Sequence, residues 1–517
     1  MTVYAPEEFT AEESEILRRY FTNLDGPVFA LVNLPEVVKG ALFARYSRTH
    51  KSLRRLFLDE FVGDLDIAGD QSVDATIGLE RAEELYEKVF FEYGDDSVAQ
   101  LGGVHLACEQ ASNILTKILE WGRLASYLEQ STRYIAYDAR LAGRYRFYRD
   151  PEVLTSRFGT RYVGDLDRMF DSYSVLMEKV TEHIRATVKR DPADSDFVFR
   201  MATRAKALDA VRGVLPAASL SNVGIYGSGQ SYEAMLIRMR AHPLPEARQY
   251  ADLMLEELRK VIPSFLRRVD LADRGGRWSD YLSDNRENTQ EVVRGLFDET
   301  PVDHSAGVVL TDFDPEGEDK LIAAICYSHT SLPETQILQR VQRLGHDEKV
   351  AILKSYIGER ENRRHRPGRA FERIDYRFDV LGDYGAFRDL QRHRLLTIEW
   401  QRLTPDHGYV MPELVAEAGV ADEFEESMTR SATLYEALRP DYPEQAAYAI
   451  SMAYRMRYSM QFNAREAIHL LELRSAPQGH PAYRRVVIEM HRLIAEKAGH
   501  LAVADAMTHM TFEAPAL

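Results

Sequence analysis

Similar segments recur in the same order in the two halves of this 517-residue chain. Residues 121–134 (WGRLASYLEQSTRY) are weakly similar to residues 392–405 (RHRLLTIEWQRLTP), and an earlier pair of segments aligns Ser47 with Ser328. No short solenoid period is present. The chain is therefore best explained as a tandem duplication of one unit, which constrains its fold more than any other feature.

The two copies are expected to be of similar length. Around residues 272–300 the apolar periodicity fades into a charged, glycine-bearing stretch, which is typical of a linker. We predict a first copy over residues 1–275, a linker over residues 276–300 and a second copy over residues 301–517.

Most of the sequence has the apolar spacing of amphipathic helices. Residues 107–121 place their apolar side chains on one helical face, so we expect a helix there. Strand candidates are fewer: residues 27–32 and 305–310 are short, contain β-branched residues and are bounded by turn residues. Residues 213–232 mix Ser, Asn, Gln, Pro and Gly, and predict a loop that enters a helix. The predicted class is a helix-rich α+β fold.

Charge and cysteine content exclude several functions. The 81 acidic and 65 basic residues give a net charge of −16, which disfavours generic binding to nucleic acid or to an anionic membrane. The N-terminus lacks a signal-peptide pattern, and no apolar stretch is long enough for a membrane span. The two cysteines are far apart, which argues against disulfides and a cysteine zinc cluster. We expect a cytoplasmic protein.

Arginines concentrate between Arg360 and Arg394, where ten occur without a single lysine. Arginine without lysine favours bidentate binding of phosphate or carboxylate, although for any single arginine here a surface ion pair is the favoured explanation. The triplet Arg392-His393-Arg394 is followed by apolar residues, so we expect it on an element packed into the core.

A helix is predicted to begin at Asn463, a good N-cap residue. Its first turn would offer backbone N–H groups beside Arg465, an arrangement that suits an anion. Arg465, His469 and Glu472 would share a polar face. An ordinary amphipathic helix with solvent-exposed ion pairs explains the same pattern.

Residues 126–134 (SYLEQSTRY) gather hydroxyl, carboxylate and guanidinium groups that could bind a phosphorylated ligand. The Ser126-x-x-Glu129 spacing is also that of a capping box at a helix start. No G-x-S-x-G motif surrounds Ser131, so a serine nucleophile is poorly supported. Metal-binding and phosphate-loop motifs are absent from the sequence, and no metal is predicted.

Both segments resemble the signature R-H-R-x-x-S-x-N-E-x-S-x-R-Y of the flavin-dependent thymidylate synthases. The first copy retains the later part of the signature, at Arg123, Ser126, Glu129, Ser131, Arg133 and Tyr134, but has Trp121, Gly122 and Leu128 at other fixed positions. The second copy retains only Arg392, His393 and Arg394. Together the copies supply every fixed residue except the asparagine.

The resemblance extends to three later elements of the family. The family's arginine before a Leu-Pro step matches Arg212 in the first copy, and Ala447 stands there in the second. Its N-x-R helix with a later arginine matches Asn463, Arg465 and Arg474, whereas the first copy has Ser228 and Gln230 at the N-x-R positions. Glu372 resembles the family glutamate near the flavin, and Gln100 resembles its first-copy counterpart.

The resemblance implies roles for these residues. Substrate binding is expected at Glu129, Ser131, Arg133, Arg212, Arg392 and Arg474, with Ser131 and Arg133 as catalytic residues. Ser131 would orient the pyrimidine rather than act as an obligatory nucleophile. Flavin binding is expected at Ser328, Glu372, Arg392, His393, Arg394, Asn463 and Arg465.

The losses in the two copies are complementary. In the family, active sites lie between subunits of a homotetramer, one subunit binding the nucleotide and another holding the flavin. The first copy retains the first set of residues and the second copy retains the other. We therefore expect a pseudo-dimer with hybrid sites, and a homodimer of chains that mimics the tetramer. Sites on the opposite pairing, with Trp121 facing Arg402, would be inactive.

The implied reaction converts dUMP to dTMP with FAD as cofactor, methylenetetrahydrofolate as carbon donor and NADPH as reductant. Decay of both signatures is also expected of a non-catalytic or repurposed paralogue that binds flavin or nucleotide. RNA binding through residues 360–394 is disfavoured because few aromatic residues are interleaved there. The sequence leaves open whether hybrid sites form within one chain or between chains.

Overall fold

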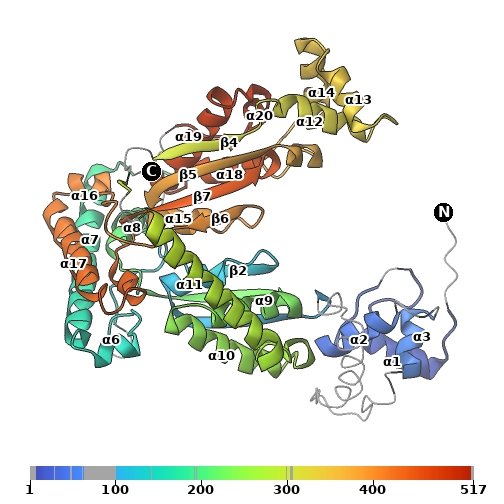
Figure 1. Cartoon of the computed structure of the whole chain (residues 1–517), viewed down its shortest axis with the longest axis horizontal. Helices are drawn as coiled ribbons and strands as arrows, with labels where there is room; N and C mark the ends of the chain where they lie inside the picture. The colour runs from blue at the N-terminus through green and yellow to red at the C-terminus, as the bar shows by residue number, and fades with distance from the viewer. Residues whose placement is uncertain are drawn as a thin grey trace. The chain divides into compact units, whose positions relative to one another are not determined.

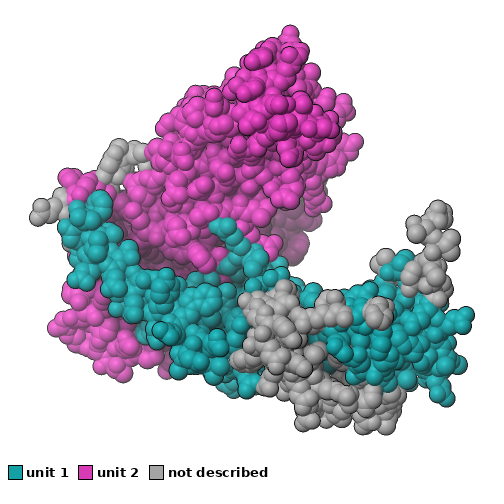
Figure 2. All heavy atoms as spheres, turned by 45° about the vertical axis from the view of Figure 1, so that its right-hand side comes forward, with its two compact units in different colours: residues 1–109, 122–129, 222–299 teal, residues 110–121, 130–221, 300–517 magenta. Residues whose placement is uncertain are grey.

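The computed structural model (Figure 1) describes residues 7–27, 29–46, 49, 51–60, 62, 100–140, 143–190, 192–193, 195–297, 300–302 and 307–513. The chain divides into two compact units, coloured in Figure 2. Unit 1 comprises residues 1–109, 122–129 and 222–299, and unit 2 comprises residues 110–121, 130–221 and 300–517. Unit 2 thus contains segments of both predicted copies.

Unit 1 combines helices with most of a small antiparallel sheet. Its helices include α1 (Ala11–Tyr20), α2 (Glu36–Tyr46), α3 (Leu53–Glu60), α9 (Gly229–Arg240), α10 (Pro245–Arg259) and α11 (Arg277–Phe297). The sheet has the order β1 (Gly103–Ser112), β3 (Leu220–Ser228), β2 (Ala125–Glu129). In this sheet Glu129 pairs with Val223. Helix α9 packs against α10.

The predicted linker, residues 276–300, is mostly helical. It forms α11, of which only Ser279 is buried. Nearly the whole helix is exposed, including large apolar side chains such as Trp278, Leu296 and Phe297. The boundaries of the two copies stay a prediction.

Unit 2 is built around a four-stranded antiparallel sheet. The strand order is β4 (Val308–Phe313), β5 (Asp375–Asp383), β7 (Arg455–Asn463), β6 (Thr397–Trp400). Strand β7 alternates half-buried and buried residues along its whole length, as expected for a strand with one face on the core. Helices α18 (Ala464–Ser475) and α19 (Pro481–Glu496) pack on each other, and α19 packs on β4 and β5.

A second layer of unit 2 is a helix bundle. The long helix α7 (Gly159–Thr187), from the first copy, packs against α8 (Asp196–Val211) and against α17 (Ala421–Leu438), from the second copy. Other elements of unit 2 are α5 (Asn113–Leu119), α6 (Pro151–Thr155), η3 (Arg212–Val214), α12 (Gly317–Tyr327), α13 (Glu334–Val341), α14 (His346–Ile357), η6 (Arg369–Arg373), α15 (Tyr384–Leu390), α16 (Glu413–Glu417), η7 (Gln445–Ala449) and α20 (Leu501–Asp505).

The order of elements repeats. The arrangement β1-β3-β2 of the first sheet corresponds to β5-β7-β6 of the second. Ser112 caps α5 where Asp383 caps α15, and Ser228 caps α9 where Asn463 caps α18; each side chain accepts a hydrogen bond from the third residue of its helix. A helix-rich α+β fold with small antiparallel sheets is therefore confirmed.

Equivalent segments of the two copies also pair with each other inside unit 2. Pro216 and Ser451 form an isolated antiparallel bridge. It is flanked by two hydrogen bonds, from Ala217 N to Ile450 O at 2.7 Å and from Met452 N to Leu215 O at 2.9 Å. The two bonds exchange roles when the numbering is shifted by the offset that relates the N-caps of α9 and α18. Such reciprocity is characteristic of contacts across a two-fold axis.

Three local predictions are wrong. Residues 107–121 are not one helix: β1 continues to Ser112, and Gln110 has a φ of 55°, which interrupts any helix. Residues 213–232 contain β3 rather than only a loop, because its small polar residues lie in a strand that has neighbours on both sides. Ser126 and Glu129 lie within β2 and not at a helix start.

One of the two predicted strands is found in the structure, and the other is not. Residues 305–310 overlap β4, although residues 303–306 lie outside the described part of the chain. Residues 27–32 contribute a bridge between Phe21 and Leu31 and no described strand. Among the described residues, no helix has the length and apolar character needed to span a bilayer.

Candidate functional site

A cluster of arginines and carboxylates lies in unit 2. Arg133 donates from Nε and Nη2 to the two carboxylate oxygens of Asp209, at 2.8 and 3.0 Å. Its Nη1 donates to Tyr483 Oη at 3.2 Å, and Nη2 also donates to the Gln478 carbonyl at 2.9 Å. Burial alone would lower the pKa of Arg133, but the charge and hydrogen bonds of Asp209, together with Tyr483 and Asp389, outweigh burial and raise it. A residue of the first copy is thus anchored on the second.

Arg212 lies at the centre of this cluster, at the end of α8, and is buried. Its Nη2 lies 3.3 Å from Asp389 Oδ2 and 3.4 Å from the Gly385 carbonyl. Its Nε lies 3.7 Å from Asp209 Oδ1. Asp209 therefore joins Arg133 to Arg212, and Asp389 joins Arg212 to the second copy.

Asp389 is buried on α15 among several guanidinium groups. Burial alone would raise its pKa, but the positive charges of Arg212, Arg392 and Arg474 outweigh burial and hold the pKa of Asp389 well below its usual range. Asp389 is therefore ionised at neutral pH. The arginines around it outnumber the carboxylates, which leaves the cluster suited to an anionic ligand.

Arg474 leads from this cluster to a second group of polar side chains. Its Nε donates to His393 Nε2 at 3.0 Å, and His393 Nδ1 lies 3.0 Å from Glu466 Oε1. His393 and Glu466 are both buried. Burial, with the charges of Arg474 and Arg366, lowers the pKa of His393 well below its usual value, whereas burial raises the pKa of Glu466.

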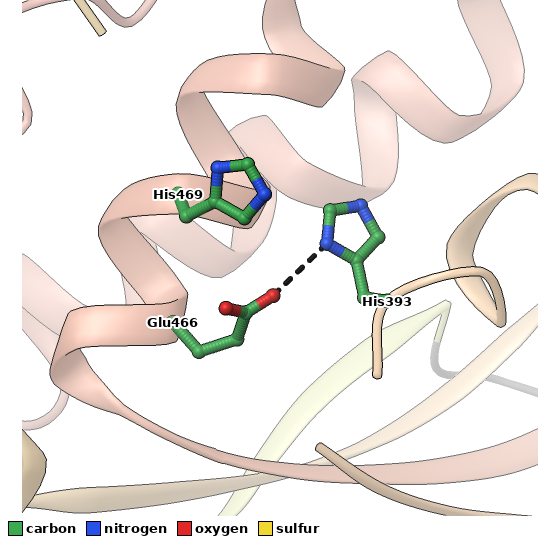
Figure 3. A group of neighbouring side chains, drawn as sticks. All are labelled: His393, Glu466 and His469. Carbon is green, nitrogen blue, oxygen red and sulfur yellow. Dashed lines mark hydrogen bonds and ion pairs between the residues drawn. The ribbon is translucent and has the colours of Figure 1, made fainter. Parts of the chain in front are cut away.

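His469 completes a group that has the residue types of a metal site. Figure 3 shows Glu466 and His469 on one helix, α18, facing His393 on a loop. One ligand atom of each of the three lies within 4.8 Å of the others. Arg366 Nη2 lies 3.1 Å from His469 Nδ1, and burial lowers the pKa of His469 to about 4. Two neighbouring guanidiniums, from Arg366 and Arg474, oppose a cation at this place.

The helix predicted at Asn463 is confirmed. Its Oδ1 accepts a hydrogen bond from Glu466 N at 2.9 Å. Arg465 donates from Nε to the Pro367 carbonyl at 2.9 Å, and its Nη1 lies 3.5 Å from Glu372 Oε1. A hydrogen bond from Arg369 is the main cause that lowers the pKa of Glu372. The structure thus brings Asn463, Arg465 and Glu372 together at the start of α18.

The expected burial of the Arg392-His393-Arg394 triplet is only partly right. His393 is buried, whereas Arg392 and Arg394 are exposed. The triplet lies in the turn before β6, and only the histidine side chain is directed into the core. The prediction that Glu472 lies on a polar face of the helix with Arg465 and His469 is also wrong. Glu472 is buried and forms a bidentate pair with Arg360 at 2.6 Å.

Other predicted site residues lie apart from this cluster or outside the described residues. Ser131 Oγ accepts a hydrogen bond from Arg133 N at 3.2 Å, and so adjoins the cluster. Glu129 is buried in β2 of unit 1, so its role in a shared site stays a prediction. Ser328 is exposed at the end of α12. Ser47 lies outside the described residues.

The family model of the thymidylate synthase complementing proteins matches residues 44–264 and 308–499. The chain belongs to this family. The two matched regions are those expected of a tandem duplication, so the predicted kinship with the flavin-dependent thymidylate synthases is confirmed.

Relatives have the same overall length. A UPF0159 protein of Chlamydia pneumoniae is 38% identical over 498 residues, covering 95% of this chain and 93% of its own. A UPF0159 protein of Thermoplasma acidophilum is 31% identical and covers 88% and 92%. A UMP/dUMP methylase of Streptomyces cacaoi, solved with 5-Br dUMP, covers 39% of this chain and 94% of its own at 18% identity and a TM-score of 0.30. That score is too low to support an argument.

Sequence reasoning missed the carboxylates of this thymidylate synthase complementing protein. Asp209 and Asp389 each stand three residues before an arginine of the family pattern, Arg212 and Arg392 respectively. A D-x-x-R spacing next to a predicted anion site could have identified both. Glu466 stands three residues after the N-cap Asn463, which indicates the helix start, yet its side chain bonds His393 instead of closing a capping box.

The first copy of this family member has a neutral pair where the second has an ionic one. Gln100 Nε2 donates to Gln230 Oε1 at 2.6 Å. These two residues correspond by sequence to Glu372 and Arg465, which lie 3.5 Å apart. The first copy therefore lacks the guanidinium that its counterpart has at this position.

Proposed function

We propose that this chain is a flavin-dependent thymidylate synthase that converts dUMP to dTMP, with methylenetetrahydrofolate as carbon donor and NADPH as reductant. The observation that carries the proposal is the cluster in which first-copy Arg133 and Arg212 meet second-copy Asp389 and Arg474. Each copy supplies only some of the residues of this cluster, so the cluster requires both copies.

The arginines would bind the nucleotide phosphate. Arg212 is buried and already oriented by Asp389, so binding costs little further loss of side-chain freedom. Arg133 is held by Asp209 in a bidentate pair, and its backbone N–H donates to Ser131 Oγ, which keeps the two residues adjacent. Ser131 would orient the pyrimidine. Two aspartates offset part of the positive charge, which lets the empty site stay folded without phosphate.

The residues at the start of α18 fit an FAD. Arg465 and the first turn of α18 combine a guanidinium with backbone N–H groups, a donor set that suits a pyrophosphate. His393, Arg392 and Arg394 approach from the loop before β6, and Glu372 pairs with Arg465. Ser328 is included by family resemblance. When bound, reduced FAD supplies the hydride that completes the methyl group.

We further propose that the two copies form a pseudo-dimer, over residues 1–275 and 301–517, and that two chains form a homodimer. The reciprocal hydrogen bonds around Pro216 and Ser451 support the pseudo-dimer, as does the packing of α7 on α17. Because Arg133, Arg212 and Arg474 all lie in unit 2, the hybrid site would form within one chain.

The test is NADPH oxidation by purified protein with and without dUMP, together with detection of dTMP. We expect a yellow protein whose NADPH oxidation requires or is accelerated by dUMP, and Arg212→Ala should abolish dTMP formation. Arg439→Ala is the matched control, because Arg439 is exposed at the end of α17 and forms an ion pair with its neighbour Glu436. A colourless protein that FAD does not reconstitute refutes the proposal. A yellow protein whose NADPH oxidation does not change when dUMP is added supports a repurposed paralogue.

A further inference from the structure

A buried chain of three polar side chains ends on Arg474. Glu466 Oε1 lies 3.0 Å from His393 Nδ1, and Arg474 Nε donates to His393 Nε2 at 3.0 Å. Glu466 and His393 retain only 4% and 7% of their exposed surface. Hydrogen bonds between buried polar groups are costly to leave half-made, so the three groups act as one unit.

The donors and acceptors fix the tautomer of His393. A guanidinium only donates, so His393 Nε2 must carry its lone pair toward Arg474. The ring proton is then on Nδ1, from which it is donated to Glu466. Burial and the charge of Arg474 keep the imidazole neutral by lowering the pKa of His393. Without Glu466, the ring could place its proton on Nε2, where it would oppose Arg474.

The hydrogen bonds from Glu466 through His393 to Arg474 also determine which atoms of Arg474 remain available to a ligand. Its Nε is used by His393, and its guanidinium lies 5.5 Å from the centre of the Tyr483 ring. Asp389, which belongs to the same copy, acts on it electrostatically. Arg474 is thereby held at Nε, and its terminal amino groups, which also interact with Tyr483, are the part left to bind a ligand.

We propose that Glu466 is a positioning residue that holds His393 as its Nδ1–H tautomer and thereby aims Arg474 at the nucleotide. This inference rests on the proposed function only in taking dUMP as the ligand of Arg474. Glu466 does not itself touch the nucleotide in this scheme.

A metal site is the competing explanation for the same residues. His393, Glu466 and His469 come close enough to share an ion. However, both ring nitrogens of His393 are already bonded, and Arg366 lies 3.1 Å from His469. A cation would have to displace Arg474 and would be repelled by the positive charges of Arg366 and Arg474. The hydrogen-bonded series Glu466–His393–Arg474, called the polar relay below, is therefore the better explanation.

The first test compares Glu466→Leu with Glu466→Gln, using calorimetry of dUMP binding. Loss of a hydrogen bond within a charged chain should weaken dUMP binding about tenfold in Glu466→Leu. Glu466→Gln keeps an oxygen that can accept from Nδ1–H, so its affinity should stay within about threefold of wild type. Equal tenfold losses in both variants would overturn the tautomer argument. Flavin content and circular dichroism report whether each variant is folded.

The second test asks whether Glu466 acts through Arg474. We expect Glu466→Leu to have no further effect on dUMP affinity in an Arg474→Lys background, because the residue it positions is already lost. Full additivity would overturn the proposal. In ¹⁵N-histidine spectra of the wild-type protein, His393 should show the Nδ1–H tautomer, and the Nε2–H form would contradict it.

The outcomes separate the two proposals. Wild-type protein that binds no dUMP refutes the proposed function, whereas wild-type protein that binds dUMP with both Glu466 variants unchanged refutes only the positioning role. Calorimetry with Zn²⁺ alone should detect no stoichiometric binding to the wild type. Tight Zn²⁺ binding that His469→Ala abolishes would establish a metal site and overturn the relay.

Discussion

Removing Arg212 should destabilise unit 2 through the carboxylate that it leaves behind. In Arg212→Met, Asp389 loses the guanidinium 3.3 Å away while staying buried. Breaking a buried ion pair from one side typically costs about 3–5 kcal/mol of folding free energy. Adding Asp389→Asn removes the stranded charge at nearly constant volume, so the double variant should recover most of that loss. Neither variant should bind dUMP.

The pH dependence of the folding stability tests the same charge argument. In the wild type the pKa of Asp389 is depressed, so its stabilising contribution is present above the unfolded carboxyl pKa of about 4 and is lost as the pH falls below it. In Arg212→Met, the pKa of Asp389 is less depressed than in the wild type, because one of the positive charges that hold it down is gone. Asp389 of the variant is then protonated at a higher pH than that of the wild type, and the stability difference from wild type should narrow as the pH falls below about 4.

The assay is urea unfolding followed by circular dichroism at pH 3, 4, 5 and 7, with Arg439→Met as the control. The exposed side chain of Arg439 should contribute less than about 1 kcal/mol. A double variant that unfolds as easily as Arg212→Met would refute the charge argument. So would a stability difference that does not change with pH.

Three further predictions concern the whole chain. Mixing Arg133→Ala with Arg392→Ala protein should not restore dTMP synthesis, because we place the hybrid site within one chain; recovery after subunit exchange would place it between chains. The purified protein should bind about one FAD per chain, measured from flavin absorbance after denaturation, and a ratio of two would show that the first copy's own site is active. Ellman's reagent should modify Cys326 before Cys108 in the native protein, because burial raises the pKa of Cys108 to about 12; equal rates would contradict its burial.

The family and the α+β class could be predicted from the sequence because the signature residues are read by identity and not by conformation. Individual helices and strands were less predictable where a strand is continuous with a helix and shares its apolar spacing. Residues 113–119 have the apolar pattern of a helix and form one, but the same pattern was extended into β1, whose partners are distant in sequence. Pairing with distant strands decided the outcome, and no local pattern reports it.

The arginines of the candidate site were predictable, and their partners were not. Arg212 and Arg474 stand at positions that the family pattern marks. Asp389 and Glu466 matter because the fold buries them beside Arg212 and His393, which are far away in sequence. An acidic residue in an acidic protein gives no sign of burial, so only the tertiary structure distinguishes these carboxylates from the solvent-exposed majority.

The pairing of Pro216 with Ser451 has a consequence for how this protein can change over time. In an assembly of identical subunits, one mutation alters every subunit at once, and both sides of an interface must tolerate it. Here the two partners of the bridge are separate stretches of one gene product, each able to mutate alone. Dilution cannot part them either, because covalent connection gives them a high local concentration. A lost residue on one side is then harmless wherever the other side still performs that task.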